Sequence, residues 1–546
     1  MAKSRIHIKS VSSHPFAIAF ITLLLYAALT NTTKAAAPAA DDSLLVTTKS
    51  GQLHGASRPT GGAEFLAIPY AQPPIGDLRW HEPLPTKPWS GVRDASTFGA
   101  PCSQPILGTW NLRDSETSKE DCLFLNVITP VWPPKSPLPV MFWLHGGANT
   151  GGTASSALYK DGTLVQHGVL LVTVNYRLGI FGFLAHPALT RESSHHASGN
   201  YGLMDQILAL RWVHDNIAQF GGDPNKITVF GQSAGAVDTG LLMTSPLSKE
   251  VFNRAIAESG AAFTLPMPLL PNAEKDGEKL AAILKAPSGD DAIKFLRQMS
   301  SSDILAALSK QPQTEVPDFG PDIDGWVVPH SPATIFTNGE ESAIPLIVGT
   351  TAREFGMSAS PDELRKRIEN ATGDLANKAL PLYGLDKNNP NATTLADPLY
   401  GTAADQWLGD FLFRCPVTTE AAWHAAHHPT YEYEFAHAIP GHESEGAVHS
   451  ADLPYVFGFY PTRGNIGGTF TEADHKLADL IETYWTNFAK TGNPNSPTQP
   501  QWPEFDKTQT YIQFTQAGEV KKSQSLREKQ CDLYREVLKE HMHSPQ

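Results

Sequence analysis

A serine flanked by small residues is the first candidate for chemistry in this chain. Residues 231–235 read GQSAG, after the β-branched and aromatic run 227–230 and before a segment typical of a helix start. Small residues on both sides let a strand turn sharply into a helix, which would present the hydroxyl of Ser233 beside the helix N-terminus. A G-x-S-x-G pattern also arises by chance in ordinary turns, but the order of strand, turn and helix favours a nucleophile. Ser233 is therefore the candidate nucleophile.

A serine hydroxyl is a weak nucleophile and needs a base, an orienting acid and an anion hole. Residues 144–148 read LHGGA and follow a strand-like run, so the backbone N–H groups of Gly147 and Ala148 are candidates for the anion hole. The N–H of Ala234, next to the serine, would add a third donor. Each such donor is worth about 10²–10³ in rate in a preorganised site. A glycine-rich turn alone is more often a packing feature, but the turn and the elbow together favour catalysis.

The elements that must position these groups alternate along the chain. Apolar runs at 123–128, 140–144, 169–174 and 344–348 lack alternation, which is typical of parallel strands covered on both faces. Helical periodicity appears between and after them, at 201–220, 473–490 and 526–538. We therefore expect an α/β fold with a central, mostly parallel sheet flanked by helices. The motif-free region 266–313 is helical in character and predicts a helical insertion over the active site.

The N-terminus resembles a targeting signal rather than part of the fold. Residues 1–37 contain a basic start, an apolar run at 16–29 and three alanines at 35–37, which is the pattern of a secretory signal peptide. A membrane anchor is the alternative, but the run is shorter than the ~20 residues a spanning helix needs. We expect one domain from about residue 41 to 546 and a secreted or periplasmic location. The sequence does not indicate an oligomeric state.

Charge and cysteine content narrow the function classes. The formal net charge of −14 argues against a nucleic-acid partner and against binding to an acidic membrane surface. Four cysteines in an exported chain favour disulfides, although buried free thiols are possible, and the spacing alone leaves three pairings open.

Several longer motifs resemble one family. Residues 145–147 read HGG, 120–127 read EDCLFLNV, 175–179 read NYRLG and 221–224 read GGDP. Together with the elbow, they resemble the type-B carboxylesterases, the cholinesterase-like branch of the α/β-hydrolase fold that includes bacterial para-nitrobenzyl esterases. The resemblance extends from about residue 46 to 538.

This resemblance implies the remaining catalytic groups. The family's acid is a glutamate after a sheet strand, and the segment GTTAREFG at 349–356 matches it at Glu354. The family's histidine precedes an apolar segment ending in Phe-Gly, and HSADLPYVFG at 449–458 matches it at His449. The chain order serine, acid, histidine is that of α/β-hydrolases. His449 would act as general base and then general acid, and Glu354 would orient its imidazole.

The resemblance also implies disulfides and supporting residues. Cys102 with Cys122 matches the family's early bridge, and Cys415 with Cys531 its late one. Ser259 matches a serine that supports the histidine in relatives, and an ordinary helix-end serine is an equal alternative. The elbow carries Gln232 where most relatives carry glutamate. One negative charge fewer beside the nucleophile predicts neutral or acidic esters rather than cationic ones.

The sequence thus predicts a secreted serine carboxylesterase that acts on small-molecule esters through an acyl-enzyme, with no metal or other cofactor. The alternatives are a cholinesterase, a lipase or a bulky-ester hydrolase of the same family, and a non-catalytic adhesion-type homologue. His424, His427 and His428 lie at near-helical spacing. Without nearby acidic or cysteine support, a solvated helix face is favoured over a metal site.

Overall fold

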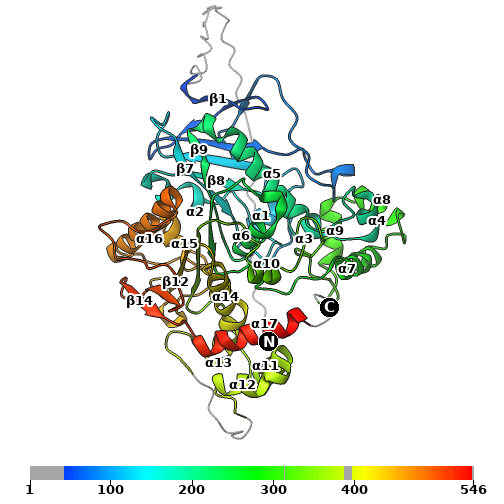
Figure 1. Ribbon diagram of the computed structural model, residues 1–546. Helices are drawn as coiled ribbons and strands as arrows, with labels where there is room; N and C mark the ends of the chain where they lie inside the picture. The colour runs from blue at the N-terminus through cyan, green and yellow to red at the C-terminus, as the bar shows by residue number, and fades with distance from the viewer. Residues whose placement is uncertain (1–41, 313, 387–395, 544–546) are drawn as a thin grey trace, which may run out of the picture. The chain divides into compact units, whose positions relative to one another are not determined.

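The fold is built around a central sheet of eleven strands (Figure 1). The computed structural model describes residues 42–312, 314–386 and 396–543, so the predicted signal peptide at 1–37 lies outside the described residues. The strand order is β14-β13-β12-β11-β10-β9-β7-β8-β6-β4-β3. The bounds are β3 Ala56–Ser57, β4 Ala63–Pro69, β6 Phe124–Thr129, β7 Leu138–Leu144, β8 Leu170–Val174, β9 Gly222–Gln232, β10 Arg254–Glu258, β11 Leu346–Thr351, β12 Thr430–Phe435, β13 Thr510–Phe514 and β14 Val520–Gln524.

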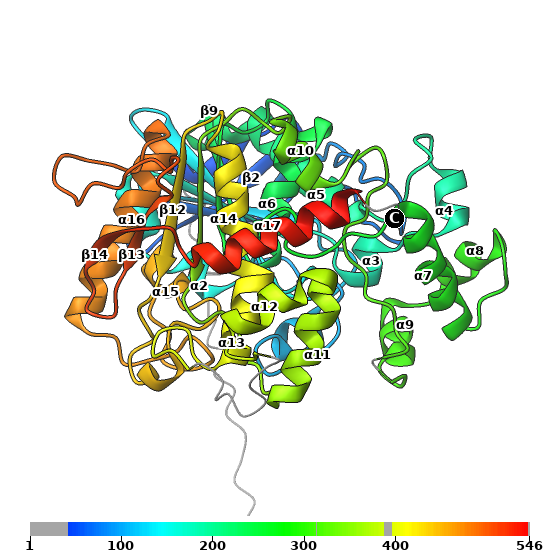
Figure 2. The same ribbon diagram turned by 60° about the horizontal axis from the view of Figure 1, so that its bottom comes forward.

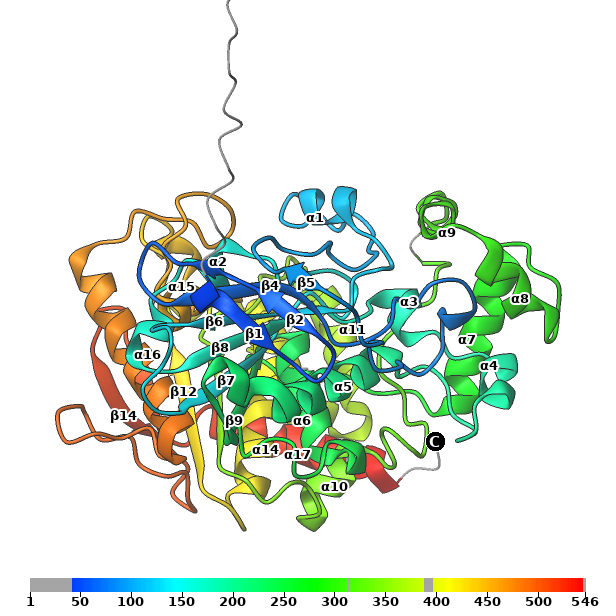
Figure 3. The ribbon, with the colours of Figure 1, turned by 90° about the horizontal axis from the view of Figure 1, so that it is seen from above.

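Most neighbouring strands run parallel, as the apolar runs predict. Every pair from β8 through β7, β9, β10, β11 and β12 to β13 is parallel, while β6, β4 and β3 on one edge and β14 on the other join antiparallel. β11 is shifted from the predicted 344–348 because the pairing continues through the polar residues Thr350 and Thr351. A second, small sheet of β1 Leu45–Thr47, β2 Gln52–His54 and β5 Val92–Asp94 lies beside β4 and β6 (Figure 3).

Side chains of β7 show why the sheet is buried on both faces. Val140, Phe142 and Leu144 belong to one hydrophobic cluster, whereas Met141 and Trp143 belong to another. Because successive residues of a strand point to opposite faces, the two clusters are the two layers between sheet and helices. A strand buried on both faces has no reason to alternate in polarity, which explains the continuous apolar runs.

Helices cover both faces. Figure 2 shows α16 on one side of the strands, and α14 with α17 on the other. α5 and α6 pack on the same face as α14 and contribute to the same hydrophobic cluster. The helices are α1 Leu112–Thr117, α2 Ala157–Lys160, α3 Gly179–Phe183, α4 Pro187–Glu192, α5 Tyr201–Asn216, α6 Ala234–Thr244, α7 Leu270–Ile283, α8 Asp291–Gln298, α9 Ser301–Leu308, α10 Pro332–Asn338, α11 Pro361–Thr372, α12 Ala376–Leu382, α13 Ala403–Gly409, α14 Cys415–His424, α15 Leu453–Phe457, α16 Glu472–Thr491 and α17 Glu528–His543.

Two helical segments interrupt the strand order. The first, between β10 and β11, contains α7, α8 and α9, which lie beside α3 and α4 in Figure 1. The second, between β11 and β12, contains α11, α12, α13 and the π-helical turn Asp410–Arg414. Only the first was predicted as helical from its sequence, and the second brings Phe413 against His449, with ring centroids 5.1 Å apart.

Both predicted disulfides are present. Cys102 is bonded to Cys122, and Cys415 is bonded to Cys531. The second bridge joins the first residue of α14 to α17, and α14 in turn packs on β11 and β12. The C-terminal helix is thereby covalently attached to the layer that covers the sheet. Within the described residues, no helix is long and apolar enough to cross a membrane.

The prediction of a solvated helix face for the histidines at 424–428 is wrong for His424. Its side chain is fully buried, with Nδ1 2.7 Å from Glu341 Oε1 and Nε2 2.8 Å from the carbonyl oxygen of Ile344. The partner Glu341 lies 83 positions away in the sequence. No local pattern could therefore have identified the pair.

Candidate active site

Ser233 occupies a strained turn between β9 and α6. Its φ of 59° and ψ of −124° lie in a region that costs a non-glycine residue about 1–3 kcal/mol. The flanking glycines are required by close contacts: a Cβ on Gly231 would lie 2.3 Å from the carbonyl oxygen of Gly235, and a Cβ on Gly235 would lie 2.0 Å from that of Leu144. The Ser233 N–H donates to the carbonyl of Glu258 at 2.9 Å. The sequence thus forms a sharp elbow at the end of a parallel strand.

Glu354 and His449 come together at the same edge of the sheet. Glu354 lies three residues beyond the end of β11, and His449 lies in the loop that follows β12. His449 Nδ1 and Glu354 Oε2 are 2.5 Å apart, and the other carboxylate oxygen accepts from the Thr351 N–H at 2.9 Å. A carboxylate only accepts hydrogen bonds, so the imidazole carries a proton on Nδ1, and in the neutral ring the lone pair is on Nε2.

Gln232 contacts this imidazole directly. Its Nε2 lies 3.0 Å from His449 Nε2, so the amide N–H donates to the ring's lone pair. Among the hydrogen bonds between described residues, none joins Ser233 Oγ to His449. From the sequence, Gln232 was predicted only to reduce the negative charge beside Ser233. The structure places it on the nitrogen that a general base would use.

The glycine loop after β7 lies against the elbow. A Cβ on Gly146 would lie 2.7 Å from the carbonyl oxygen of Gln232 and 3.0 Å from Ser233 Cβ. The Gly147 carbonyl accepts from the N–H groups of Thr150 and Gly151, both at 3.0 Å, which curls the loop back on itself. Within the part of the chain that the structure describes, the N–H groups of Gly147, Ala148 and Ala234 donate to no protein acceptor. Among the described residues, these three backbone donors of the loop and the elbow are therefore left without a protein partner.

His145, at the start of this loop, is neutral. Burial lowers the pKa of His145 to about 4, and its Nδ1 donates to the Gly146 carbonyl at 2.8 Å. Its ring stacks on that of Tyr176 with centroids 4.5 Å apart, and the Tyr176 hydroxyl donates to the His145 carbonyl at 2.6 Å. His145 therefore braces the loop without adding positive charge to it.

Buried acids surround the Glu354–His449 pair. Burial and the neighbouring Asp452 carboxyl raise the pKa of Glu258 well above its usual range. Burial and the charge of Glu354 likewise raise the pKa of Asp452. Both carboxyls thus retain protons at higher pH than exposed ones, which limits the negative charge beside Glu354. Ser259 is fully buried with a φ of 56°, and its Oγ has no partner among the described residues, so its supporting role stays a prediction.

Two aromatic side chains lie next to the site, and the sequence analysis missed the role of Phe355. The Phe355 ring is 45% exposed and lies 4.2 Å from the His449 ring, measured between centroids. Trp110, half exposed, approaches the anion-hole loop: a Cβ on Gly147 would lie 3.3 Å from its ring. The only available signal was the position of Phe355 directly after Glu354. These rings give the site apolar walls.

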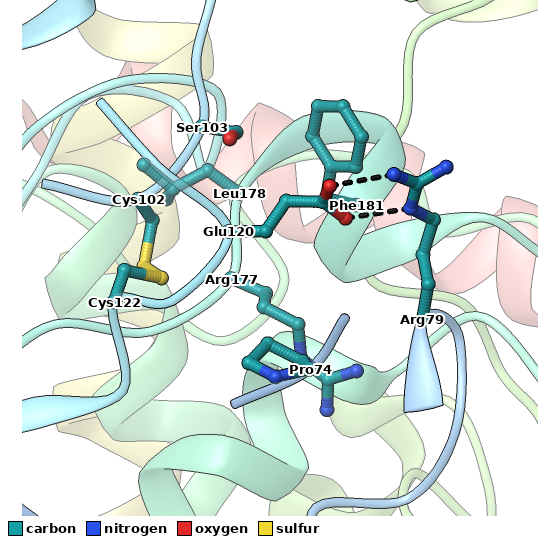
Figure 4. A pocket seen from close by; sticks show the side chains of 9 residues that line it. All are labelled: Pro74, Arg79, Cys102, Ser103, Glu120, Cys122, Arg177, Leu178 and Phe181. Carbon is teal, nitrogen blue, oxygen red and sulfur yellow. Dashed lines mark hydrogen bonds and ion pairs between the residues drawn. A yellow bond between two sulfur atoms is a disulfide. The ribbon is translucent and has the colours of Figure 1, made fainter. Parts of the chain in front are cut away.

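A small cavity lies by the first disulfide rather than at Ser233 (Figure 4). It measures about 10 Å³, which is room for about one water molecule. Arg79 and Glu120 line it and form two hydrogen bonds of 2.6 and 2.5 Å. Arg79 also donates to the carbonyls of Leu296 and Met299, both at 2.8 Å. This ion pair ties the disulfide loop to the helical segment after β10.

Among the described residues, no cluster of three His, Cys, Asp or Glu residues could hold a metal ion.

Comparisons with known proteins indicate one family. A family model described as the carboxylesterase family matches residues 42–534. The fumonisin B1 esterase of Sphingopyxis macrogoltabida is 36% identical over 523 residues, which cover 92% of each chain. Carboxylesterase 1E of Mus musculus is 34% identical over 533 residues, covering 89% of this chain and 91% of the mouse protein. A solved PNB esterase superposes with a TM-score of 0.76 at 31% identity, covering 90% of this chain and all of that one.

Proposed function

Because the chain belongs to the carboxylesterase family, we propose that it hydrolyses carboxylic esters with Ser233 as nucleophile, His449 as general base and Glu354 as the orienting acid. The carboxylic ester hydrolase activity and the α/β-hydrolase fold follow from the family. The roles of the individual residues are the proposal. The observation that carries it is the 2.5 Å contact of His449 Nδ1 with Glu354, at the sheet edge where the elbow presents Ser233.

The chemistry proceeds in two halves. Ser233 Oγ attacks the ester carbonyl while His449 Nε2 takes the hydroxyl proton, and Glu354 stabilises the imidazolium. The N–H groups of Gly147, Ala148 and Ala234 stabilise the oxyanion. His449 then protonates the leaving alcohol, and a water molecule repeats the sequence on the acyl-enzyme to release the acid and restore Ser233.

Gln232 contacts the nitrogen of His449 that would take the Ser233 proton. Its amide donates to Nε2, a contact that only the neutral imidazole offers. During attack, the Ser233 proton replaces this contact. A glutamate at position 232 would instead accept a hydrogen bond from a protonated Nε2.

The Gln232→Glu variant tests this role. A carboxylate at position 232 accepts from the protonated Nε2, so the acidic limb of the kcat/KM–pH profile should move up by about 1 pH unit. The profile is measured between pH 5 and 9 with a para-nitrophenyl ester. Gln166→Glu, which adds the same charge at an exposed position, should leave the limb in place. An unshifted or downward-shifted limb in Gln232→Glu would contradict the proposal.

The neutral elbow also bears on substrate charge. Without a carboxylate beside the nucleophile, we propose that neutral or acidic esters are preferred to cationic ones. Acetylcholine and 3,3-dimethylbutyl acetate have the same shape and differ in one charge, so purified protein should give the higher kcat/KM with the neutral ester. No hydrolysis of either ester or of para-nitrophenyl acetate would contradict the proposed activity, and a preference for acetylcholine would contradict the substrate charge.

We also propose export of the protein, supported by the two disulfides and by the signal-peptide pattern in residues 1–37. Disulfides persist in oxidising compartments outside the cytoplasm, which is the location that the pattern predicts.

A further inference from the structure

The anion-hole loop has an unfavourable backbone conformation. Gly147, Ala148 and Asn149 have consecutive positive φ values of 111°, 55° and 54°. Glycine adopts such values freely, but alanine and asparagine do so at a cost that the surrounding structure must offset. Without an anchor, the loop would relax to a less costly conformation, which would change the directions of the Gly147 and Ala148 N–H groups.

Asn149 is anchored through both its backbone and its side chain. Its carbonyl oxygen accepts from the Gly179 N–H at 2.6 Å. Its buried side-chain amide donates from Nδ2 to Asp238 Oδ1 at 2.8 Å. Asp238 lies in α6, the helix that begins directly after Ser233. The hydrogen bond therefore ties the anion-hole loop to the same helix that presents the nucleophile.

Burying the carboxylate of Asp238 lowers the stability of the fold. It is fully buried, and its two hydrogen bonds come from neutral amides: Asn149 Nδ2 and, at 2.6 Å, Gln206 Nε2 of α5. Burial raises the pKa of Asp238 to about 7, although both amides favour its charged form. The amide oxygens of Asn149 and Gln206 are left without partners among the described residues. A polar group that costs stability beside a strained loop is typical of functional positioning.

We propose that Asp238 is a positioning residue, which holds the N–H groups of Gly147 and Ala148 on the oxyanion through the side chain of Asn149. The inference rests on the proposed function, because it concerns the anion hole of that reaction. Asp238 touches neither substrate nor Ser233 in this role. It acts on the transition state only through the loop.

The Asn149→Gly variant removes the side-chain anchor without straining the backbone, because glycine adopts a φ of 54° freely. We expect kcat for para-nitrophenyl acetate to fall about 10- to 100-fold, less than or comparable to the loss of one anion-hole donor. KM should stay within about threefold, since the ester's ground state gains little from the hole. The affinity for a trifluoromethyl ketone, whose adduct with the serine carries the oxyanion, should fall by the same factor as kcat.

Two further variants separate positioning from stability. Asp238→Ala should reproduce the loss of kcat and of inhibitor affinity. Asp238→Asn should recover most of both, because its carbonyl oxygen still accepts from Asn149, and the unpartnered amide oxygen of Gln206 can turn to accept from the new NH₂ group. Asn216→Ala, which removes a buried amide at the far end of α5, should lower the melting temperature but leave kcat and inhibitor affinity within about threefold.

The outcomes are distinguishable. Unchanged kcat and inhibitor affinity in Asn149→Gly and Asp238→Ala, with a wild-type protein that binds the ketone, would overturn the inference alone. Equal losses of kcat and inhibitor affinity in Asp238→Asn and Asp238→Ala would also overturn the inference alone. A wild-type protein that neither hydrolyses the ester nor binds the ketone would overturn the proposed function, and this inference with it.

Discussion

Replacing Ser233 by alanine is expected to lower kcat for a para-nitrophenyl ester by about 10⁴–10⁶-fold. The variant lacks the oxygen that forms the acyl-enzyme, while the N–H donors of the anion hole and the apolar walls remain and leave a small residual rate over water. Steady-state kinetics measure the loss. Mass spectrometry should find the phosphoryl adduct of an organophosphate on the wild-type peptide that contains Ser233, and no adduct on that peptide in the variant.

A matched control is a serine with a similar backbone conformation. Ser525 has a φ of 54° and follows β14, the strand at the edge of the sheet, whereas Ser233 has a φ of 59° and follows a central strand. Ser525→Ala should retain wild-type kcat and labelling. Retained labelling at the wild-type rate in Ser233→Ala would contradict the assignment of the nucleophile.

The local parts of this site could be predicted from the sequence, because each depends on neighbouring residues. Gly231 and Gly235 are spaced for the elbow, and the structure shows that a Cβ at either position would collide with a backbone carbonyl. The parallel strands are visible as continuous apolar runs, since a strand covered on both faces has no polar side. Pairing Ser233 with Glu354 and His449 required a family resemblance, because Glu354 lies 121 positions after the serine and His449 lies 216 positions after it (354 − 233 and 449 − 233).

Contacts between distant segments were beyond sequence reasoning. Gln232 and His449 are 217 positions apart, and the side chains meet only because β9 and β12 end at the same edge of the sheet. Asp238 is a charged residue in an otherwise apolar helix. Its partners Asn149 and Gln206 come from a loop and from another helix, so the sequence does not identify them. Phe413 reaches His449 from a segment without any motif.

The second large effect is expected for Glu354→Gln, which should lower kcat by about 10⁴-fold without unfolding the protein. In the wild type, Glu354 Oε1 accepts from the Thr351 N–H, and Oε2 accepts from His449 Nδ1. Thr351 would hold the oxygen of the new amide, so the NH₂ group would face Nδ1. An NH₂ group only donates, and Nδ1 would have to give up its proton.

The consequence falls on the other ring nitrogen. A neutral imidazole without a proton on Nδ1 carries its proton on Nε2, and this nitrogen then cannot accept the Ser233 proton. The histidine would be present in the wrong tautomer. The ¹⁵N chemical shifts of the ring, measured together with kcat, should show that the proton has moved from Nδ1 to Nε2.

Glu341→Gln provides the matched control, because Glu341 and His424 form a similar buried contact of 2.7 Å on another part of the fold. Both substitutions remove one buried carboxylate from a histidine that contacts it, so any loss of stability should be similar in kind. Only Glu354→Gln changes a histidine that must accept a proton from a serine. Glu341→Gln should therefore keep kcat within about threefold of wild type, and an equal loss of kcat in the two variants would mean that Glu354 stabilises the fold rather than orienting the base.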